Sequence, residues 1–194
     1  MATTQRLLTA EELDQLPRDG CRRRLIAGEL IEMSPGNKRH GKYAMRVAGP
    51  LTGYIYAHGL GEVYAAETGF ILATGPDTIQ APDFAFANRA GADAAEVAEG
   101  PYFPGPPDLA VEVVSPNDTY AEVEDTVATW LAYGTRVVVV VNPRRRRVGV
   151  HRPGPAPGLA EVQTLTEADT LTIPDLFPGW SLPVAAIFAK APPR

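Results

Sequence analysis

Residues 108–116 read DLAVEVVSP, an apolar run that is interrupted only by Glu112 and bounded by turn residues. Continuous apolar runs of this length are typical of strands that are buried on both faces of a sheet. A helical pattern follows and ends near Tyr133, after which residues 135–141, TRVVVVV, are the most strand-like of the chain. The stretch 108–141 therefore predicts a strand–helix–strand unit whose two strands are parallel.

Hydrophobic periodicity and turn residues predict further elements on both sides of this unit. They are a short helix after Thr9, strands at 24–26 and 29–33, a turn at 34–37, a helix at 38–58, and strands at 62–65, 69–73, 83–86 and 147–151. Gly49-Pro50 predicts a kink or a displaced boundary in the helix at 38–58, and Asn117 or Asp118 is the expected cap of the later helix. Residues 88–107 are rich in Ala, Gly and Pro and predict a long surface connection. The fold class is α/β, with a mixed β-sheet flanked by helices, an N-terminal hairpin and a C-terminal β extension.

The composition is that of one globular domain. We expect a single domain over 1–194, with a core at about 22–151 and a C-terminal extension at about 152–194. Cys21 is the only cysteine, which excludes an internal disulfide framework and a cysteine-based zinc cluster. No apolar run reaches transmembrane length and the N-terminus carries no signal-peptide pattern, so a cytoplasmic protein is expected.

The net charge of −5 conceals two oppositely charged stretches. Residues 22–46 hold seven Lys or Arg against two Glu, whereas residues 83–125 hold ten acids against Arg89 alone. Such a separation suits a protein that holds a polyanion beside a cation site. Charge alone, however, favours two ordinary solvated surfaces.

Two acids stand in strand-like sequence: Asp83, in the run APDFAF, and Glu112. A carboxylate in such surroundings is costly unless a partner compensates its charge. A Mg²⁺ ion is one such partner, because it prefers oxygen ligands and usually takes one or two protein carboxylates. The backbone carbonyl of Val113 is a natural third ligand, and Glu29 and Glu67 are further acids that could approach the same site.

A structural ion pair is the alternative for both acids, with Arg24 or Arg136 as the partner. His40 is likewise more typical of a surface or capping histidine than of a catalytic base, although a phosphate contact is compatible with its position. The residues alone leave these alternatives open.

Several ordered segments resemble the Uma-two (Uma2) family, which is similar to restriction endonucleases of the PD-(D/E)xK nuclease superfamily. The segments are LIAGELIEMSP at 25–35, ETGF at 67–70, APDFAF at 81–86, GPPDLAVEVVSP at 105–116, VVNP at 140–143 and LFPGWSLP at 176–183. Together they cover nearly the whole chain. The ordered series is more specific than the Pro-Asp pair alone.

This resemblance implies the restriction-endonuclease fold and hydrolysis of nucleic-acid phosphodiester bonds with Mg²⁺ or Mn²⁺, with DNA as the first candidate substrate. It implies that Asp83 and Glu112 are catalytic and bind the metal together with the Val113 carbonyl, and that Glu29 or Glu67 assists. The side chains expected to bind nucleic acid are Arg24, Lys38, Arg39, His40 and Lys42. No membrane partner is expected, and a homodimer is left open.

The chain departs from the family pattern at the active-site lysine. The superfamily places this lysine two residues after the strand acid, where Val114 stands, and Uma2 proteins usually place it on the following helix, where Thr126 stands. Thr126 is therefore a catalytic candidate that can orient a water but supplies no charge. Lys38 or Lys42, or an arginine, are alternative sources of that charge.

Two other functions are left open, and the first of them follows from the missing lysine. One is a catalytically weakened or inactive nuclease-fold module that binds nucleic acid or protein. The other is a hydrolase that uses the carboxylate pair on another substrate.

Overall fold

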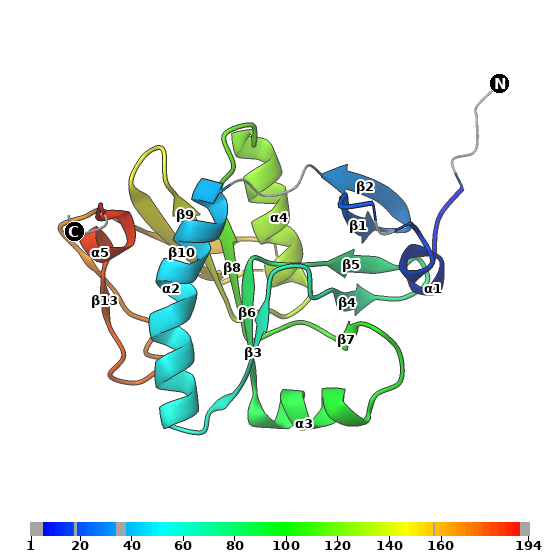
Figure 1. The fold of residues 1–194 in the computed structure, drawn as a ribbon, viewed down its shortest axis with the longest axis horizontal. Coiled ribbons are helices and arrows are strands. Elements are labelled where there is room, and N and C mark those ends of the chain that lie inside the picture. Colours follow the sequence, from blue (N-terminus) through cyan, green and yellow to red (C-terminus); the bar gives the residue numbers. More distant parts are fainter. Residues whose placement is uncertain (1–5, 18, 34–37, 157, 191–194) are drawn as a thin grey trace.

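The computed structural model describes residues 6–17, 19–33, 38–156 and 158–190 of the chain. Its centre is a six-stranded sheet in the order β11-β10-β9-β8-β6-β3 (Figure 1). Strands β8 (Leu109–Val113) and β9 (Val137–Asn142) are parallel, and α4 (Tyr120–Ala132) connects them, which confirms the predicted strand–helix–strand unit. All other neighbours in this sheet are antiparallel; these strands are β3 (Gly61–Ala65), β6 (Phe84–Asn88), β10 (Arg147–Pro153) and β11 (Ala160–Leu165).

A second sheet of five strands lies beside the first, in the order β2-β1-β5-β4-β7 (Figure 1). Its strands are β1 (Arg22–Ile26), β2 (Glu29–Met33), β4 (Phe70–Ala73), β5 (Thr78–Gln80) and β7 (Phe103–Pro104), and the short helix α1 (Ala10–Asp14) packs against it. Ala27 and Gly28 turn the predicted β1–β2 hairpin with positive φ angles of 50° and 81°. The predicted α/β class with mixed sheet and flanking helices is confirmed, and the strands form two main sheets with a small third pair of β12 (Thr170–Leu171) and β13 (Leu182–Pro183).

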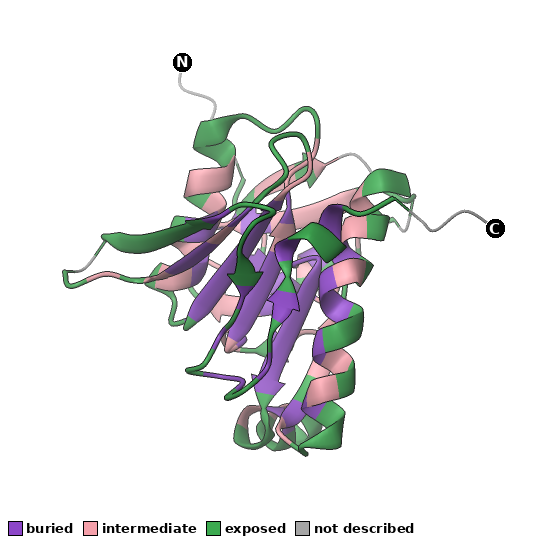
Figure 2. Ribbon diagram, turned by 90° about the vertical axis from the view of Figure 1, so that its left-hand side faces the viewer, coloured by how far each residue is buried: buried purple, intermediate pink, exposed green. Residues whose placement is uncertain are grey.

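The valine run of β9 is buried because helices cover both faces of the six-stranded sheet. Successive strand side chains point to opposite faces. Val137, Val139 and Val141 join a cluster with α2 (Lys38–Ala57) and α5 (Val184–Phe188), whereas Val138 and Val140 join a cluster with α4. Figure 2 shows these strands as buried and the outer sides of the helices as exposed.

Several expectations need correction or lie outside the described residues. Residues 88–107 contain a helix, α3 (Arg89–Val97), which begins where the Asn88 side chain accepts a hydrogen bond from the Gly91 N–H at 3.0 Å. Helix α4 is capped by Thr119 rather than by Asn117 or Asp118. Helix α2 continues through Gly49-Pro50, so its boundary is not displaced. The turn expected at 34–37 lies outside the described residues. Among the described helices, none has the length and apolar character needed to cross a membrane.

Candidate active site

The pairing of β6 with β8 brings the two predicted acids together. Phe84 is opposite Val111 in the antiparallel register, so Asp83 and Glu112 adjoin at the same end of these strands. The backbone N–H of Asp83 continues the pairing by donating to the Val111 carbonyl at 3.0 Å. Both acids line one pocket of about 450 Å³. The structure thus makes the strands that carry the two acids direct neighbours in one sheet.

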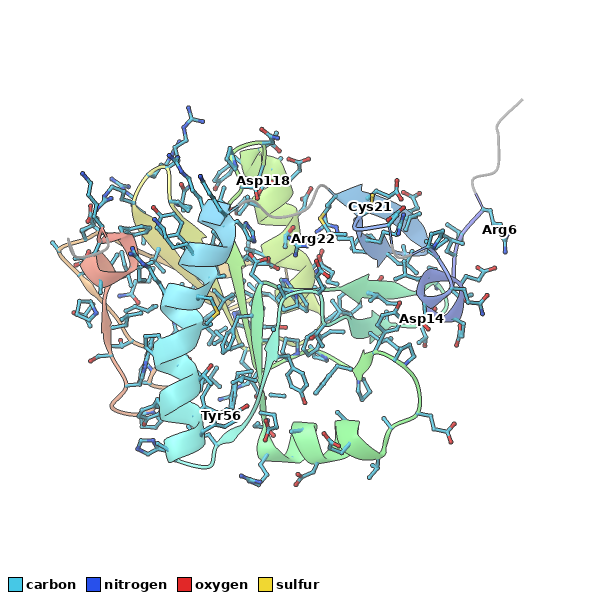
Figure 3. The ribbon with its side chains drawn as sticks, in the orientation of Figure 1. Arg6, Asp14, Cys21, Arg22, Tyr56 and Asp118 are labelled. Carbon is cyan, nitrogen blue, oxygen red and sulfur yellow. The ribbon has the colours of Figure 1, made fainter. Side chains whose placement is uncertain are left out.

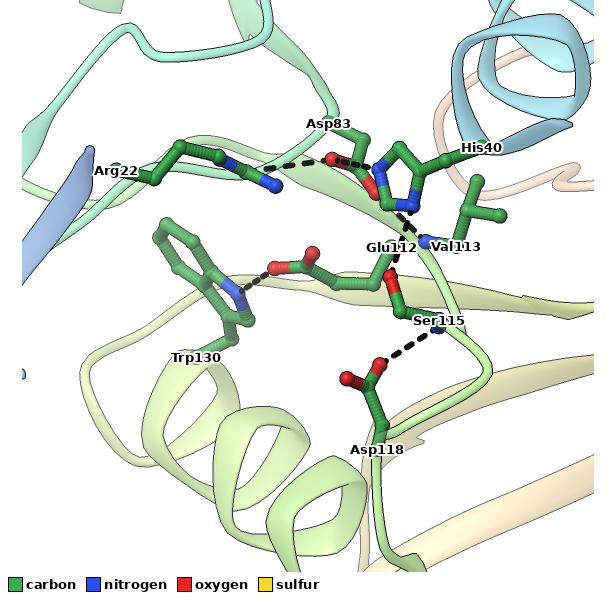
Figure 4. Close-up of polar contacts among 8 residues, drawn as sticks. All are labelled: Arg22, His40, Asp83, Glu112, Val113, Ser115, Asp118 and Trp130. Atoms are coloured by element: carbon green, nitrogen blue, oxygen red, sulfur yellow. Dashed lines mark hydrogen bonds and ion pairs between the residues drawn. The ribbon is translucent and has the colours of Figure 1, made fainter. Parts of the chain in front are cut away.

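Asp83 is buried, with 5% of the residue exposed, and both of its carboxylate oxygens are engaged. Oδ2 accepts a hydrogen bond from the Val113 N–H at 2.8 Å. Oδ1 lies 2.6 Å from His40 Nε2 and 3.4 Å from Arg22 Nη2 (Figure 4). These contacts explain how the charge of Asp83 is tolerated in the interior. The ion-pair partner is Arg22, not Arg24 or Arg136.

His40 connects α2 to the acid pair. Its Nδ1 lies 3.3 Å from Ser115 Oγ, while its Nε2 faces Asp83 (Figure 4). Ser115 is itself fixed, because its backbone N–H donates to Asp118 Oδ2 at 2.7 Å. The surface or capping role that the sequence favoured for His40 is therefore wrong, since its ring is part of the pocket wall.

Glu112 is held by the indole of Trp130, whose Nε1–H donates to Oε1 at 2.8 Å (Figure 4). Burial, and to a smaller extent the neighbouring charge of Asp83, raises the pKa of Glu112 to about 8, while the Trp130 hydrogen bond and the charges of Arg22 and Arg24 act in the opposite direction. The pocket therefore contains two carboxylates of which one resists ionisation. A strongly perturbed acid in a concave site is a marker of functional sites.

The three consecutive arginines of β1 point to alternate faces of the strand. Arg22 and Arg24 line the pocket, whereas Arg23 forms ion pairs with Asp19 at 2.6 Å and Glu32 at 2.9 Å. Figure 3 places Arg22 between the β1–β2 hairpin and α4. Two positive charges therefore face the acid pair from the second sheet.

Arg24 reaches the helix position at which the family usually has its lysine. Its Nη1 donates to Thr126 Oγ1 at 3.2 Å and to Gln80 Oε1 at 3.1 Å. The Thr126 hydroxyl in turn donates to the Glu122 carbonyl at 2.8 Å. Thr126 thus lines the pocket and contacts the positively charged guanidinium of Arg24, although it carries no charge itself.

The remaining predicted residues lie outside this pocket. Glu29 is exposed on β2, and Glu67 lines a separate pocket of about 610 Å³ beside β1 and α1, so the structure does not bring either acid to the Asp83–Glu112 pair. Lys38, Arg39 and Lys42 are exposed on the first turns of α2 and are not among the pocket-lining residues. Their contact with nucleic acid remains a prediction.

Arg22, Trp130 and Gln80 are pocket or supporting residues that sequence reasoning missed. A period of two on β1 could have linked Arg22 to Arg24. By contrast, no local pattern could have joined Trp130 to Glu112, because this contact depends on the way α4 packs on the sheet.

The donor set fits a hard divalent cation bound through two carboxylates. A cation beside Asp83 and Glu112 would offset the repulsion that contributes to the raised pKa of Glu112. Within the described part of the chain, no group of three or more His, Cys, Asp or Glu side chains is placed to hold a metal. This arrangement fits Mg²⁺, which retains several waters, and does not fit a closed structural zinc site.

The parallel strand–helix–strand unit and the mixed central sheet define an α/β protein that holds two acids where β6 and β8 adjoin. The chain belongs to the Uma2 family, described as "Putative restriction endonuclease", whose family model matches residues 10–185. A solved structure from Anabaena variabilis, described as a "putative nuclease belonging to DUF820", shares the fold with a TM-score of 0.78 and 18% identity. The similarity covers 93% of this chain and 97% of that chain. A search of curated proteins gives no match.

Proposed function

We propose that this protein is a metal-dependent endonuclease that hydrolyses nucleic-acid phosphodiester bonds in the pocket between its two sheets. One observation carries the proposal: Asp83 and Glu112 adjoin in a pocket that Arg22 and Arg24 also line. The pocket therefore combines carboxylates that suit a cation with positively charged guanidinium groups that suit a phosphate. Membership of the Uma2 family supports the same function.

Asp83 and Glu112 are the residues that would hold Mg²⁺ or Mn²⁺, and the Val113 carbonyl remains the predicted third ligand. When bound, such an ion supplies neutralisation of phosphate charge and a water of lowered pKa. The chain's own groups fix the two acids: the Val113 N–H orients Asp83, and the Trp130 indole orients Glu112. The charge of Arg22 compensates the pair while no cation is present.

The test is a cleavage assay with purified protein on plasmid DNA, single-stranded DNA and RNA, in Mg²⁺, in Mn²⁺ and in EDTA. We expect cleavage that needs the metal and that falls at least about 100-fold in Asp83→Asn, because one of only two carboxylate ligands is lost. Glu161→Gln, which removes one exposed carboxylate from β11, is the matched control and should cleave like the wild type. Absence of cleavage by the clean wild-type protein, with no difference from Asp83→Ala, would contradict the proposal.

Thr126 favours a second candidate, a nuclease-fold module that binds nucleic acid or protein without cleaving it. Titration calorimetry with Mg²⁺ or Mn²⁺ separates part of this question, because metal binding without turnover in the cleavage assay favours such a module. A gain of cleavage in Thr126→Lys would support it further. Absence of any affinity for DNA or RNA would instead favour a hydrolase that acts on another substrate.

A further inference from the structure

The positive charges of the pocket differ in what compensates them. Among the described pocket-lining residues, the basic side chains are Arg22, Arg24 and His40. Arg22 and His40 both contact Asp83 Oδ1. Arg22 and His40 therefore already interact with an acid of the pair.

Arg24 is held by neutral groups instead. Its Nη1 donates to the Gln80 amide oxygen and to the Thr126 hydroxyl, and within the part of the chain that the structure describes it forms no ion pair. The Nε of Arg24 and the Nε2 of Gln80 are buried without a hydrogen-bond partner. Gln80 itself is 2% exposed.

Such an arrangement is unfavourable for the empty protein. A partly buried guanidinium without a carboxylate partner, next to an unpaired amide N–H, carries a desolvation penalty that an anion would remove. Both groups line the same pocket, and the hydrogen bonds to Arg24 use only Nη1. The Nη2 group of Arg24 is thereby left as a donor for an anionic oxygen, whereas its Nε is buried.

We propose that Arg24 binds the reacting phosphate and neutralises the charge that develops on it, with Gln80 and Thr126 as the positioning residues of the guanidinium. This inference rests on the proposed nuclease function and deepens it. Arg24 supplies the positive charge from β1, whereas a lysine at position 126 would supply it from α4. The two positions are in contact, because Arg24 Nη1 lies 3.2 Å from Thr126 Oγ1. Because a guanidinium stays protonated, Arg24 stabilises charge but does not remove a proton from water.

The experiment compares Arg24→Gln with Arg23→Gln, its neighbour on the opposite face of β1, in single-turnover cleavage. We expect Arg24→Gln to cleave at least about 100-fold more slowly, as when one stabilising donor is removed from a reaction centre. Arg23→Gln should stay within about threefold of the wild type, because its partners Asp19 and Glu32 hold it away from the acid pair. Mn²⁺ affinity by calorimetry should be retained in both variants.

A charge swap distinguishes phosphate binding from a structural role. In Arg24→Gln combined with Thr126→Lys, the ammonium group approaches the same place from α4, and we expect at least about tenfold recovery of the rate that Arg24→Gln loses. A merely structural loss would not be repaired by a new lysine on another element. If Arg24→Gln does not fold, as judged by urea unfolding, Arg24→Lys provides the comparison with the charge kept.

The cleavage experiments distinguish a failure of this inference from a failure of the proposed nuclease function. If the wild type cleaves and Arg24→Gln cleaves equally fast, the inference is overturned and the nuclease function stands. If the wild type does not cleave, binding of a fluorescent 20-nucleotide single strand decides the role of Arg24. An affinity loss of about tenfold in Arg24→Gln but not in Arg23→Gln would support phosphate binding, and equal affinities would overturn it.

Discussion

Replacement of Glu112 by glutamine should stabilise the metal-free protein at alkaline pH, while a divalent ion reverses the order. The raised pKa of Glu112, about 8 in the folded state, means that the folded protein retains a proton that the unfolded chain releases above a pKa of about 4.5. Stability therefore falls as the pH rises from 4.5 to 8 and is constant above it. The neutral amide introduced by Glu112→Gln has no such titration, and its oxygen can still accept the Trp130 hydrogen bond.

The magnitude follows from the size of the pKa change. Each pKa unit corresponds to about 1.4 kcal/mol, so a rise from 4.5 to about 8 sets an upper bound of roughly 5 kcal/mol. Because Glu112 is only partly buried, solvent screens part of this cost, and we expect a gain of about 2–3 kcal/mol for Glu112→Gln at pH 8.5. At pH 5 the two proteins should differ by less than about 1 kcal/mol.

Urea unfolding in EDTA, repeated at half-unit steps from pH 5 to pH 9, measures this difference. Glu161→Gln on β11 is the control for the loss of one exposed carboxylate and should run parallel to the wild type. Addition of Mn²⁺ should stabilise the wild type above pH 8 and leave Glu112→Gln unchanged, because one carboxylate ligand is missing. Parallel wild-type and Glu112→Gln profiles over the whole range would refute the reasoning, since Glu112 would then ionise as easily in the folded protein as in the unfolded chain.

Two further predictions concern the elements that carry the pocket. Thr119→Ala should lower the free energy of unfolding by about 1 kcal/mol, because it removes the cap of α4, whereas Asn117→Ala should change it by less than about 0.5 kcal/mol; equal effects in urea unfolding would place the cap elsewhere. Ala27→Asn should stabilise the β1–β2 hairpin by about 0.5–1 kcal/mol, because Ala27 has a φ of 50° beside Gly28 and Asn-Gly suits such a turn. A lower melting temperature for Ala27→Asn would contradict the assigned turn.

The central sheet was predictable because its sequence signals are long and periodic. The valine run at 137–141 has both faces covered, so its uninterrupted apolar pattern reports its environment directly. The short strands β5 and β7 carry no such signal, because strands of three and two residues are defined by their neighbours rather than by their own pattern. Helix α3 was missed because its alanines and glycine resemble a loop, while the Asn88 cap that begins it was available in the sequence.

The sequence predicted the two acids and the strands that carry them, but it did not predict the residues that surround them. Asp83 and Glu112 stand in recognisable strand sequences, and the pairing of β6 with β8 makes these strands neighbours. The contacts of Asp83 with Arg22 and His40 join residues that are 61 and 43 positions apart, so they depend on how the second sheet and α2 pack against the first. Glu29 shows how open such a motif leaves the position of a side chain, because this acid faces solvent once its hairpin is formed.

The charge pattern of the pocket explains how this chain can fold around two adjacent carboxylates. Arg22 forms an ion pair with Asp83, and the raised pKa of Glu112 favours the neutral form of that acid. Arg24 adds a further positive charge and forms no ion pair among the described residues. A phosphate bound to the arginines would withdraw their charge from the acids and so increase the gain from a cation at Asp83 and Glu112. By thermodynamic linkage the cation must strengthen phosphate binding by the same factor. Arg22 therefore compensates Asp83 in the ligand-free protein, and both arginines would couple the binding of a phosphate to the binding of a cation.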